Sequence, residues 1–254
     1  MKTVILVAAH KEYPMPADTL YLPVHVGKAL SAVSLPFTGD NTGDHISEKN
    51  PYYCELTALY FAWKNLDADY IGLAHYRRHF SLRKPLLPKK DKFPYILTEA
   101  QASSLLQDWD ILLPKKRNYF IETGYSQYIH SHPEEPLMKT KALLQSMYPD
   151  YMPAFEQVMS STKAHRFNMF VMKKEIFEDY CSWLFSLLFA LEKDLDISSY
   201  DSYNKRVYGF LAERLLDVYL VKNKLPYKEL PVLFMEQEHW GKKIFSFLKR
   251  KFFR

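Results

Sequence analysis

The chain is poor in cysteine, with only Cys54 and Cys181 among its 254 residues. Two cysteines are too few for a disulfide framework, and their separation matches no clustered metal-ligand spacing. A reducing compartment is therefore the default expectation, because disulfide-rich domains belong to oxidising ones. We predict that both cysteines are small core residues.

Long apolar runs are also missing. A membrane-spanning helix needs about 20 apolar residues, and the best candidate, YCSWLFSLLFALEKD, is interrupted by Glu192 and Lys193. The N-terminal MKTVILVAAH is too short for a signal peptide and lacks a small-residue cleavage site. We therefore expect a protein that is not integral to a membrane and that begins with a β-strand.

Glycine is scarce, with 7 residues, and neither G-x-x-x-x-G-K-S/T nor G-x-G-x-x-G occurs. Such loops cradle phosphate in many nucleotide-dependent enzymes, so their absence argues against a phosphotransferase of those types. The net charge of +5 is modest, and much of it comes from the C-terminal KKIFSFLKRKFFR. A nucleic-acid partner is not expected from this charge distribution.

Aromatic residues are abundant, at 16% of the chain with 19 Tyr and 17 Phe. A tyrosine ring combines an apolar face with a polar tip. This combination suits sugars and other flat, hydroxylated ligands.

Apolar periodicity predicts an alternation of strands and helices. Strands are predicted at residues 3–9, 69–74 and 168–172, in DWDILLPKKR and, as a final extended segment, in LPYKELPVLF. Helices are predicted at residues 52–65, 98–107 and 174–193 and in YGFLAERLLDVYLVKN, with two short ones between 118 and 153. Three prolines exclude a regular helix before Val26. This order predicts an α/β fold.

Basic or polar residues follow four of the predicted strands. These clusters are His10-Lys11, residues 75–79, residues 115–117 with Lys115 at their start, and Lys173-Lys174. Ligands of α/β folds bind at the carboxyl ends of the strands. If the sheet is parallel, the four clusters converge on an anionic ligand.

The cluster His75-Tyr76-Arg77-Arg78-His79 ends the buried run YIGLA. One interpretation is a solvated turn whose arginines pair with surface acids. The other is a phosphate site, because a guanidinium offers a planar fork of donors and stays charged. The histidines could bind phosphate, orient a hydroxyl or ligate a metal.

Candidate acids lie in three further segments. Asp40 and Asp44 stand in GDNTGDHISEKN, which is either an exposed loop or part of a sugar site and lacks the order of an EF-hand. Asn168 and Met169 begin a predicted strand and are either a plain strand end or part of the site. Glu213, next to Arg214, is either a surface ion pair or the general base for an acceptor hydroxyl, with Asp201 as second candidate.

The C-terminal IFSFLKRKFFR mixes phenylalanines with basic residues. Such a segment is either a loosely packed end of the chain or a basic amphipathic helix that binds an anionic membrane surface. We favour membrane binding, because consecutive exposed phenylalanines are a liability in solution.

Six segments in order resemble a bacterial family with an HYRR motif that occurs in capsular and exopolysaccharide gene clusters. They are VAAHKEY, GDNTGDHISEKNPYYCELTALYFAWKN, DYIGLAHYRRHF, DILLPKKR, FNMFVMKK and YGFLAERLL. The family was long called a domain of unknown function and is regarded as a glycosyltransferase family. The resemblance implies a GT-A-like fold with a Rossmann-type sheet flanked by helices and a less regular acceptor-side half.

The resemblance also implies an activity: transfer of a sugar from a nucleotide-diphosphate donor to a lipid-linked saccharide. UDP-hexoses are the expected donors, UDP-galactofuranose among them, because some members are regarded as inverting galactofuranosyltransferases. Where GT-A enzymes carry Asp-x-Asp to hold a metal, this chain has His75-Tyr76-Arg77. Arginine neutralises a diphosphate directly, so we expect no cofactor and no essential metal.

Residue roles follow for this interpretation. Arg77 and Arg78 are expected to stabilise the leaving diphosphate, with Glu213 or Asp201 as the base. The expected donor-binding residues are His10, Lys11, Asp40, Asp44, His75, Tyr76, Lys115, Asn168 and Met169.

The expected organisation is one domain over residues 1–241 and a basic tail over residues 242–254. Its donor half spans about 1–117 and its acceptor half about 118–241. The expected acceptor is linked to polyprenyl diphosphate, and the protein is expected to be cytoplasmic and peripheral at the inner face of the plasma membrane. The alternative function is a non-catalytic carbohydrate-binding or assembly protein of the same pathway.

Overall fold

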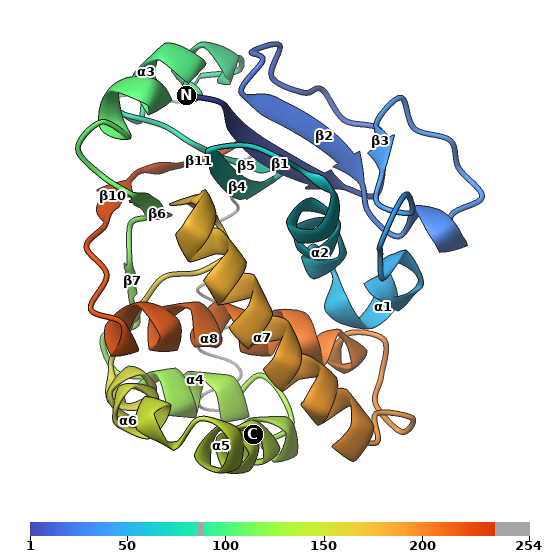
Figure 1. The fold of residues 1–254 in the computed structure, drawn as a ribbon, viewed down its shortest axis with the longest axis vertical. Coiled ribbons are helices and arrows are strands. Elements are labelled where there is room, and N and C mark those ends of the chain that lie inside the picture. The colour runs from blue at the N-terminus through green and yellow to red at the C-terminus, as the bar shows by residue number, and fades with distance from the viewer. Residues whose placement is uncertain (86–88, 237–254) are drawn as a thin grey trace.

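The computed structural model describes residues 1–85 and 89–236, which form a mixed sheet with helices packed against it (Figure 1). The sheet has the strand order β10-β6-β9-β4-β1-β2-β3, and β5 branches from this order by pairing with β4 and with β11. The α/β prediction with a sheet flanked by helices is confirmed. Its strands are β1 Thr3–Ala9, β2 Tyr21–His25, β3 Thr38–Gly39, β4 Tyr70–His75, β5 Arg78–Phe80, β6 Ile111–Pro114, β9 Phe170–Lys173, β10 Lys228–Leu230 and β11 Val232–Phe234.

Helices cover the sheet and fill the other end of the molecule (Figure 1). Figure 1 shows α4, α5, α6 and α8 gathered below the sheet, with α7 running across both parts. The short strands β7 Arg117–Asn118 and β8 Lys163–Ala164 pair separately from the main sheet. The helices are α1 Asn50–Tyr53, α2 Leu56–Asn65, α3 Glu99–Leu105, α4 Gly124–Ile129, α5 Glu135–Met147, α6 Met152–Ser160, α7 Lys174–Asp194 and α8 Val207–Lys222.

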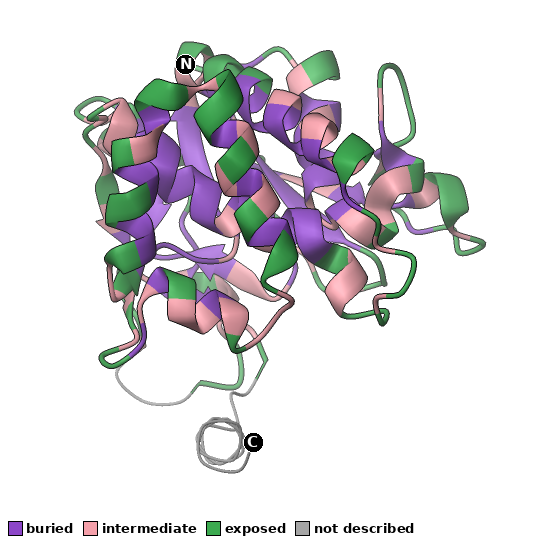
Figure 2. Cartoon of the chain, turned by 90° about the horizontal axis from the view of Figure 1, so that it is seen from below, coloured by how far each residue is buried: buried purple, intermediate pink, exposed green. Residues whose placement is uncertain are grey.

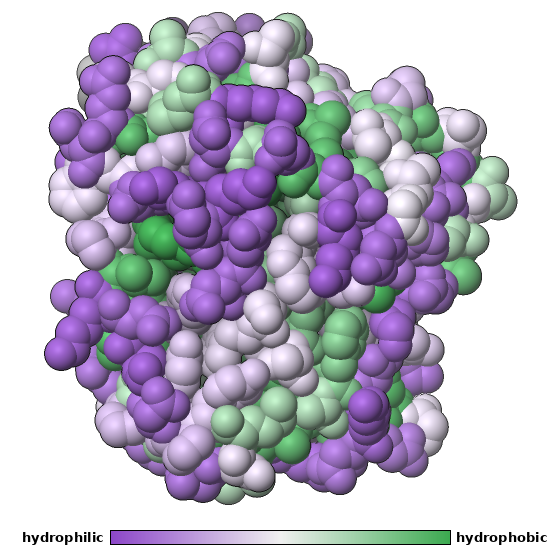
Figure 3. All heavy atoms as spheres, in the orientation of Figure 1, coloured by the Kyte–Doolittle hydropathy of each residue, from purple (hydrophilic) through white to green (hydrophobic). Residues whose placement is uncertain are grey.

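The core lies on both faces of the sheet. Along β1, Leu6 and Ala8 join one apolar cluster, and Ile5 and Val7 join the other. This division follows from the two-residue period of a strand, and it explains why β1 is apolar at almost every position. Figure 2 shows the buried residues concentrated in the strands and on the inner sides of the helices. The face of the molecule that α7 crosses in Figure 1 carries hydrophilic side chains over much of its surface, with smaller apolar areas between them (Figure 3).

The sheet is not wholly parallel. The four basic clusters were expected to converge only if it were, so this expectation is corrected for one of them. β1, β2, β3 and β4 are parallel, but β9 is antiparallel to β4 and β6. Lys173 and Lys174 therefore lie at the opposite end of the sheet from His75, where they pair with Asp110 and Asp67. The residues that precede β9 take their place beside His75.

Two local predictions also differ from the structure. The helix expected over residues 52–65 is broken at Cys54, whose φ is positive at 53°, so that α1 and α2 are separate. β2 was not predicted, because Pro23 and the prolines before it indicated an irregular segment. Pro23 is tolerated because β2 has only the two-residue β3 on its outer side.

The sheet draws strands from both expected halves of the chain, since β9 lies between β4 and β6. The basic tail of residues 242–254 lies outside the described residues, and its membrane binding stays a prediction. Within the described ranges, no helix is both long enough and apolar enough to span a bilayer.

Candidate functional site

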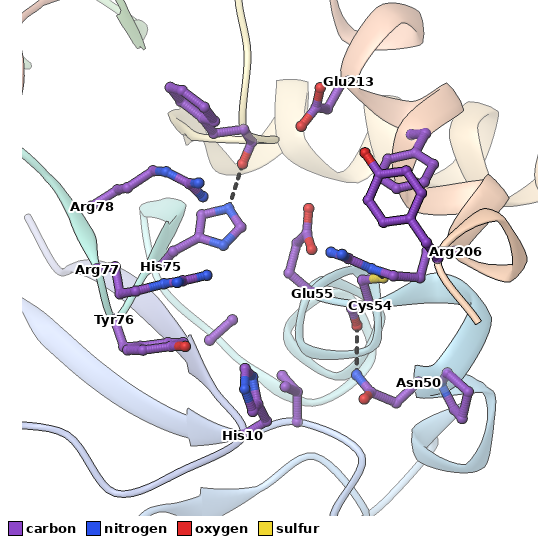
Figure 4. A pocket seen from close by; sticks show the side chains of 16 residues that line it. His10, Asn50, Cys54, Glu55, His75, Tyr76, Arg77, Arg78, Arg206 and Glu213 are labelled. Carbon is purple, nitrogen blue, oxygen red and sulfur yellow. Dashed lines mark hydrogen bonds between the residues drawn. The ribbon is translucent and has the colours of Figure 1, made fainter. Parts of the chain in front are cut away.

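A cavity of about 490 Å³ opens at the carboxyl ends of β1 and β4. This is the edge at which α/β folds bind ligands. Figure 4 shows Arg77 and Arg78 entering the cavity from one side, with Glu55, Glu213 and Arg206 opposite them. Six expected site residues line this one cavity: His10, His75, Tyr76, Arg77, Arg78 and Glu213.

The arginines reach the cavity because the chain turns back directly after β4. His75 pairs with Arg78 across an antiparallel bridge, so Tyr76 and Arg77 form the turn. Tyr76 is buried, and its ring packs edge-on against His10 at 5.4 Å between centroids. The turn is therefore anchored by aromatic packing on its inner side, which directs the charged side chains outward into the cavity.

Arg77 and Arg78 have different surroundings. The Arg77 side chain is 42% exposed and meets Glu236 at 3.3 Å. The Arg78 guanidinium lies 4.3 Å from the centre of the Phe167 ring, a cation–π arrangement. Burial, followed by the charge of Arg77, lowers the pKa of Arg78. An anion in the cavity would therefore relieve an unfavourable concentration of positive charge.

His75 supplies no positive charge to the cavity at neutral pH. Its Nε2 lies 2.5 Å from the carbonyl oxygen of Phe167. A carbonyl oxygen can only accept, so Nε2 carries the proton and Nδ1 is free of one in the neutral ring. Burial lowers the pKa of His75, and burial together with Arg77 lowers that of His10. The fixed cations of the cavity are therefore arginines.

Two charged residues of the cavity were missed by sequence reasoning. Glu55 accepts a hydrogen bond of 2.6 Å from Asn168 through Oε1. Arg206 places its Nε 3.1 Å from the Cys54 sulfur, and burial raises the pKa of that thiol to about 12. Glu55 was hidden inside a predicted continuous helix, and Arg206 inside a basic turn, so no local signal distinguished them from surface residues.

Glu213 lies on α8 with its side chain 23% exposed. Its Oε2 is 3.8 Å from the nearer guanidinium nitrogen of Arg166, which is itself buried. The cavity therefore holds two carboxylates, one hydrogen-bonded to an amide and the other facing a guanidinium.

Several expected site residues do not line the cavity. Asp40 is fully buried and accepts hydrogen bonds from the amides of Gly27 and Lys28 and from the hydroxyls of Ser47 and Thr57. These four bonds tie the loop after β2 to α2. Asp40 thus stabilises the fold at this position and does not line the cavity.

The remaining predicted residues have separate places. Asp44 accepts a bond from the Tyr60 hydroxyl, and Asp201 accepts bonds from the amides of Tyr203 and Asn204. Lys115 is exposed after β6, and Met169 is fully buried in the core. Lys11 stands beside the cavity, 5.4 Å from the centre of the Tyr76 ring. Asn168 is buried next to the cavity and reaches it through Glu55.

Among the described residues, no group of three or more His, Cys, Asp or Glu side chains is arranged to hold a metal ion. The predicted independence from metal stays a prediction, because a diphosphate ligand can itself contribute to a metal site.

Comparison with known proteins assigns the chain to a family. Residues 4–224 match the model of a domain of unknown function, DUF4422. The chain belongs to the DUF4422 family. Its structure resembles that of WbbM, described as a bifunctional glycosyltransferase in its apo form, with a TM-score of 0.85 and 34% sequence identity. No curated protein sequence gives a significant match.

The match to WbbM covers 94% of this chain but only 46% of the WbbM chain. The DUF4422 chain thus spans about half the length of that protein. The likeness confirms the expected GT-A-like α/β fold.

Proposed function

We propose that this DUF4422 protein is a glycosyltransferase that moves a sugar from a nucleotide-diphosphate donor to a saccharide hydroxyl. The observation that carries the proposal is the cavity at the ends of β1 and β4, where Arg77 and Arg78 face the carboxylates Glu55 and Glu213. Glycosyl transfer needs cations to receive the leaving diphosphate and a carboxylate to take the acceptor proton. The 34% identity to a bifunctional glycosyltransferase over 94% of this chain supports the same activity.

The charges define how the donor would lie. The diphosphate would lie against Arg77 and Arg78, with Arg206 on the far side of the cavity as a further cation. Guanidinium forks grip phosphate oxygens in two places and remain charged as the sugar bond breaks. His10 and Tyr76 would contact the nucleotide near the end of β1. Because arginines neutralise the diphosphate, we propose that a divalent metal is not essential.

The finer parts of the proposal come from the family resemblance of the six sequence segments. UDP-hexoses, including UDP-galactofuranose, are the proposed donors, and a polyprenyl-diphosphate-linked saccharide of capsule or exopolysaccharide synthesis is the proposed acceptor. We further propose that the enzyme acts at the inner face of the plasma membrane. A carbohydrate-binding or assembly protein without catalysis is the alternative, and it would need no nucleotide site.

A binding titration tests the donor site. We expect UDP to raise the melting temperature, because a ligand at 100 times its Kd stabilises the folded state by about 2.7 kcal/mol. Arg78→Ala removes a charge-assisted contact and should weaken UDP binding by roughly 10- to 100-fold. The titration is run in EDTA, so that no divalent metal is available. A second experiment then screens UDP-, GDP- and dTDP-sugars for transfer of the sugar to octyl glycosides.

Arg83→Ala is the matched control, since Arg83 is exposed and does not line the cavity. It should bind UDP as the wild type does. A protein that binds none of the nucleotides with or without Mn²⁺, or that binds them and transfers no sugar, would contradict the proposal. Binding that appears only when Mn²⁺ is added would reject the metal independence alone.

A further inference from the structure

Backbone strain is concentrated around the cavity. Five non-glycine residues have positive φ in the described part of the chain, and three of them, Cys54, Phe167 and Asn168, border the cavity or contact its lining. Their φ values are 53°, 80° and 48°. Such conformations cost free energy and persist where the surrounding contacts enforce them, most often at functional sites. The strained residues come from two segments more than 100 positions apart, and both segments converge on Glu55.

The first segment sets the backbone of Glu55. At Cys54 the chain leaves α1 with a positive φ, and the Asn50 side chain donates a 2.8 Å hydrogen bond to the Cys54 carbonyl oxygen. Glu55 then occupies the N-cap position of α2. The amino end of a helix favours a negative charge. The break at Cys54 thus places the Glu55 carboxylate at the start of α2.

The second segment sets the side chain of Glu55. Asn168 is 2% exposed and donates through Nδ2 to Glu55 Oε1 at 2.6 Å and to the Gly209 carbonyl oxygen at 3.1 Å. The preceding Phe167 accepts from His75. The strained dipeptide therefore fixes His75 and Glu55 together. In the described residues, Glu55 Oε2 makes no hydrogen bond within the protein, and the side chain lines the cavity.

We propose that Glu55 is the general base of the transfer and that Asn168 is its positioning residue. This assignment rests on the proposed function. The acceptor hydroxyl gives its proton to Glu55 Oε2 while its oxygen forms the bond to the anomeric carbon of the donor sugar. The bond from that carbon to the diphosphate breaks, and its electron pair leaves on the diphosphate oxygen beside Arg77 and Arg78. Direct displacement of this kind inverts the anomeric configuration.

Glu213 is the less suitable base of the two carboxylates. Its Oε2 faces Arg166, and a proton taken by Glu213 would leave that buried guanidinium without its counter-charge. Glu55 has an amide as its partner, which can keep its hydrogen bond to Oε1 whether or not Oε2 is protonated. Glu213 would therefore serve as a fixed counter-charge.

The test uses the full chain, the UDP-sugar and octyl glycoside selected by the donor screen, and four variants. Glu55→Gln keeps the size of the side chain and the bond from Asn168, so it should fold. We expect its kcat to fall at least 100-fold while its UDP affinity changes less than threefold. Glu55→Asp keeps the charge and should retain more activity than Glu55→Gln. Asn168→Ala should lower kcat about tenfold with little change in the KM for the donor.

Glu213→Gln is the comparison variant, and its kcat should exceed that of Glu55→Gln by at least tenfold. Proton NMR of the product should show an inverted anomeric configuration. A kcat of Glu55→Gln within threefold of wild type, equal losses in Glu55→Gln and Glu55→Asp, or a retained configuration would each overturn the assignment. Those results leave the transferase itself active. Absence of transfer by the wild type with every donor would instead overturn the proposed function, and the assignment with it.

Discussion

Burial, as well as residue type, decides which side chains of the cavity are charged. His10 and His75 follow predicted strands and look like cations in the sequence, but desolvation lowers the pKa of each. Arg77 and Arg78 stay charged in the same surroundings because a guanidinium begins from a much higher pKa. The HYRR segment thus presents a neutral imidazole beside two cations.

Asp40 shows a different consequence of burial. We expect Asp40→Ala to lower the free energy of unfolding by about 3 kcal/mol or more, because it leaves two buried hydroxyls and two amides without their acceptor. Urea unfolding measures this. The control, Asp44→Ala, removes an exposed carboxylate and should cost less than about 1 kcal/mol. Equal effects of the two changes would contradict the structural role of Asp40.

Among the elements, β9 has the greatest effect on the site. Its antiparallel direction brings its amino end, with Phe167 and Asn168, to the carboxyl end of β4. A parallel strand would have brought Lys173 and Lys174 there. The same pairing brings β9 close to β4 at Gly72, which pairs with Val171.

Gly72 tests the packing of these two strands. A β-carbon at this position would lie 2.7 Å from the Phe170 carbonyl oxygen and 2.9 Å from a Val171 methyl. We expect Gly72→Ala to destabilise the protein by about 1–3 kcal/mol, because the backbone oxygen cannot move aside freely. Thermal unfolding measures the change. In the control, Gly39→Ala, the new methyl meets side-chain atoms of Asn41 and Lys28 that can rotate away, so the effect should be smaller. A stable Gly72→Ala variant would show that the strands are less tightly packed.

For the whole molecule, buried histidines couple stability to pH. His79 is fully buried in β5, and burial lowers its pKa to about 4. An unfolded chain binds the proton at about pH 6.5, whereas the folded protein binds it only near pH 4. Stability is therefore lost as the pH falls through this window, by roughly 3 kcal/mol for this one residue.

Melting temperatures between pH 7 and 4.5 check this coupling. His79→Phe fills the same space without titrating, so its stability should fall less steeply with acid than that of the wild type. His45→Gln changes a partly exposed histidine near Glu48 and serves as the control for a histidine substitution outside the buried core. Identical slopes for wild type and His79→Phe would show that His79 does not contribute to the acid sensitivity.

The amino-acid sequence by itself predicted the longer regular elements and led us to expect an anionic ligand. The apolar runs of β1 and β4, the helical periodicity of α7 and α8, and the guanidinium pair at a strand end are local patterns, because strand and helix periods involve only neighbouring residues. Together they indicated an α/β fold and an anionic ligand before any tertiary contact was known.

Only the tertiary structure decided the direction of β9, the break at Cys54, the neutrality of His75 and the contact between Glu55 and Asn168. Each depends on residues far apart in the chain, and Glu55 and Asn168 are separated by 113 positions. Strand direction, desolvation and hydrogen bonding at such separations result from packing of the whole core, which no local pattern encodes.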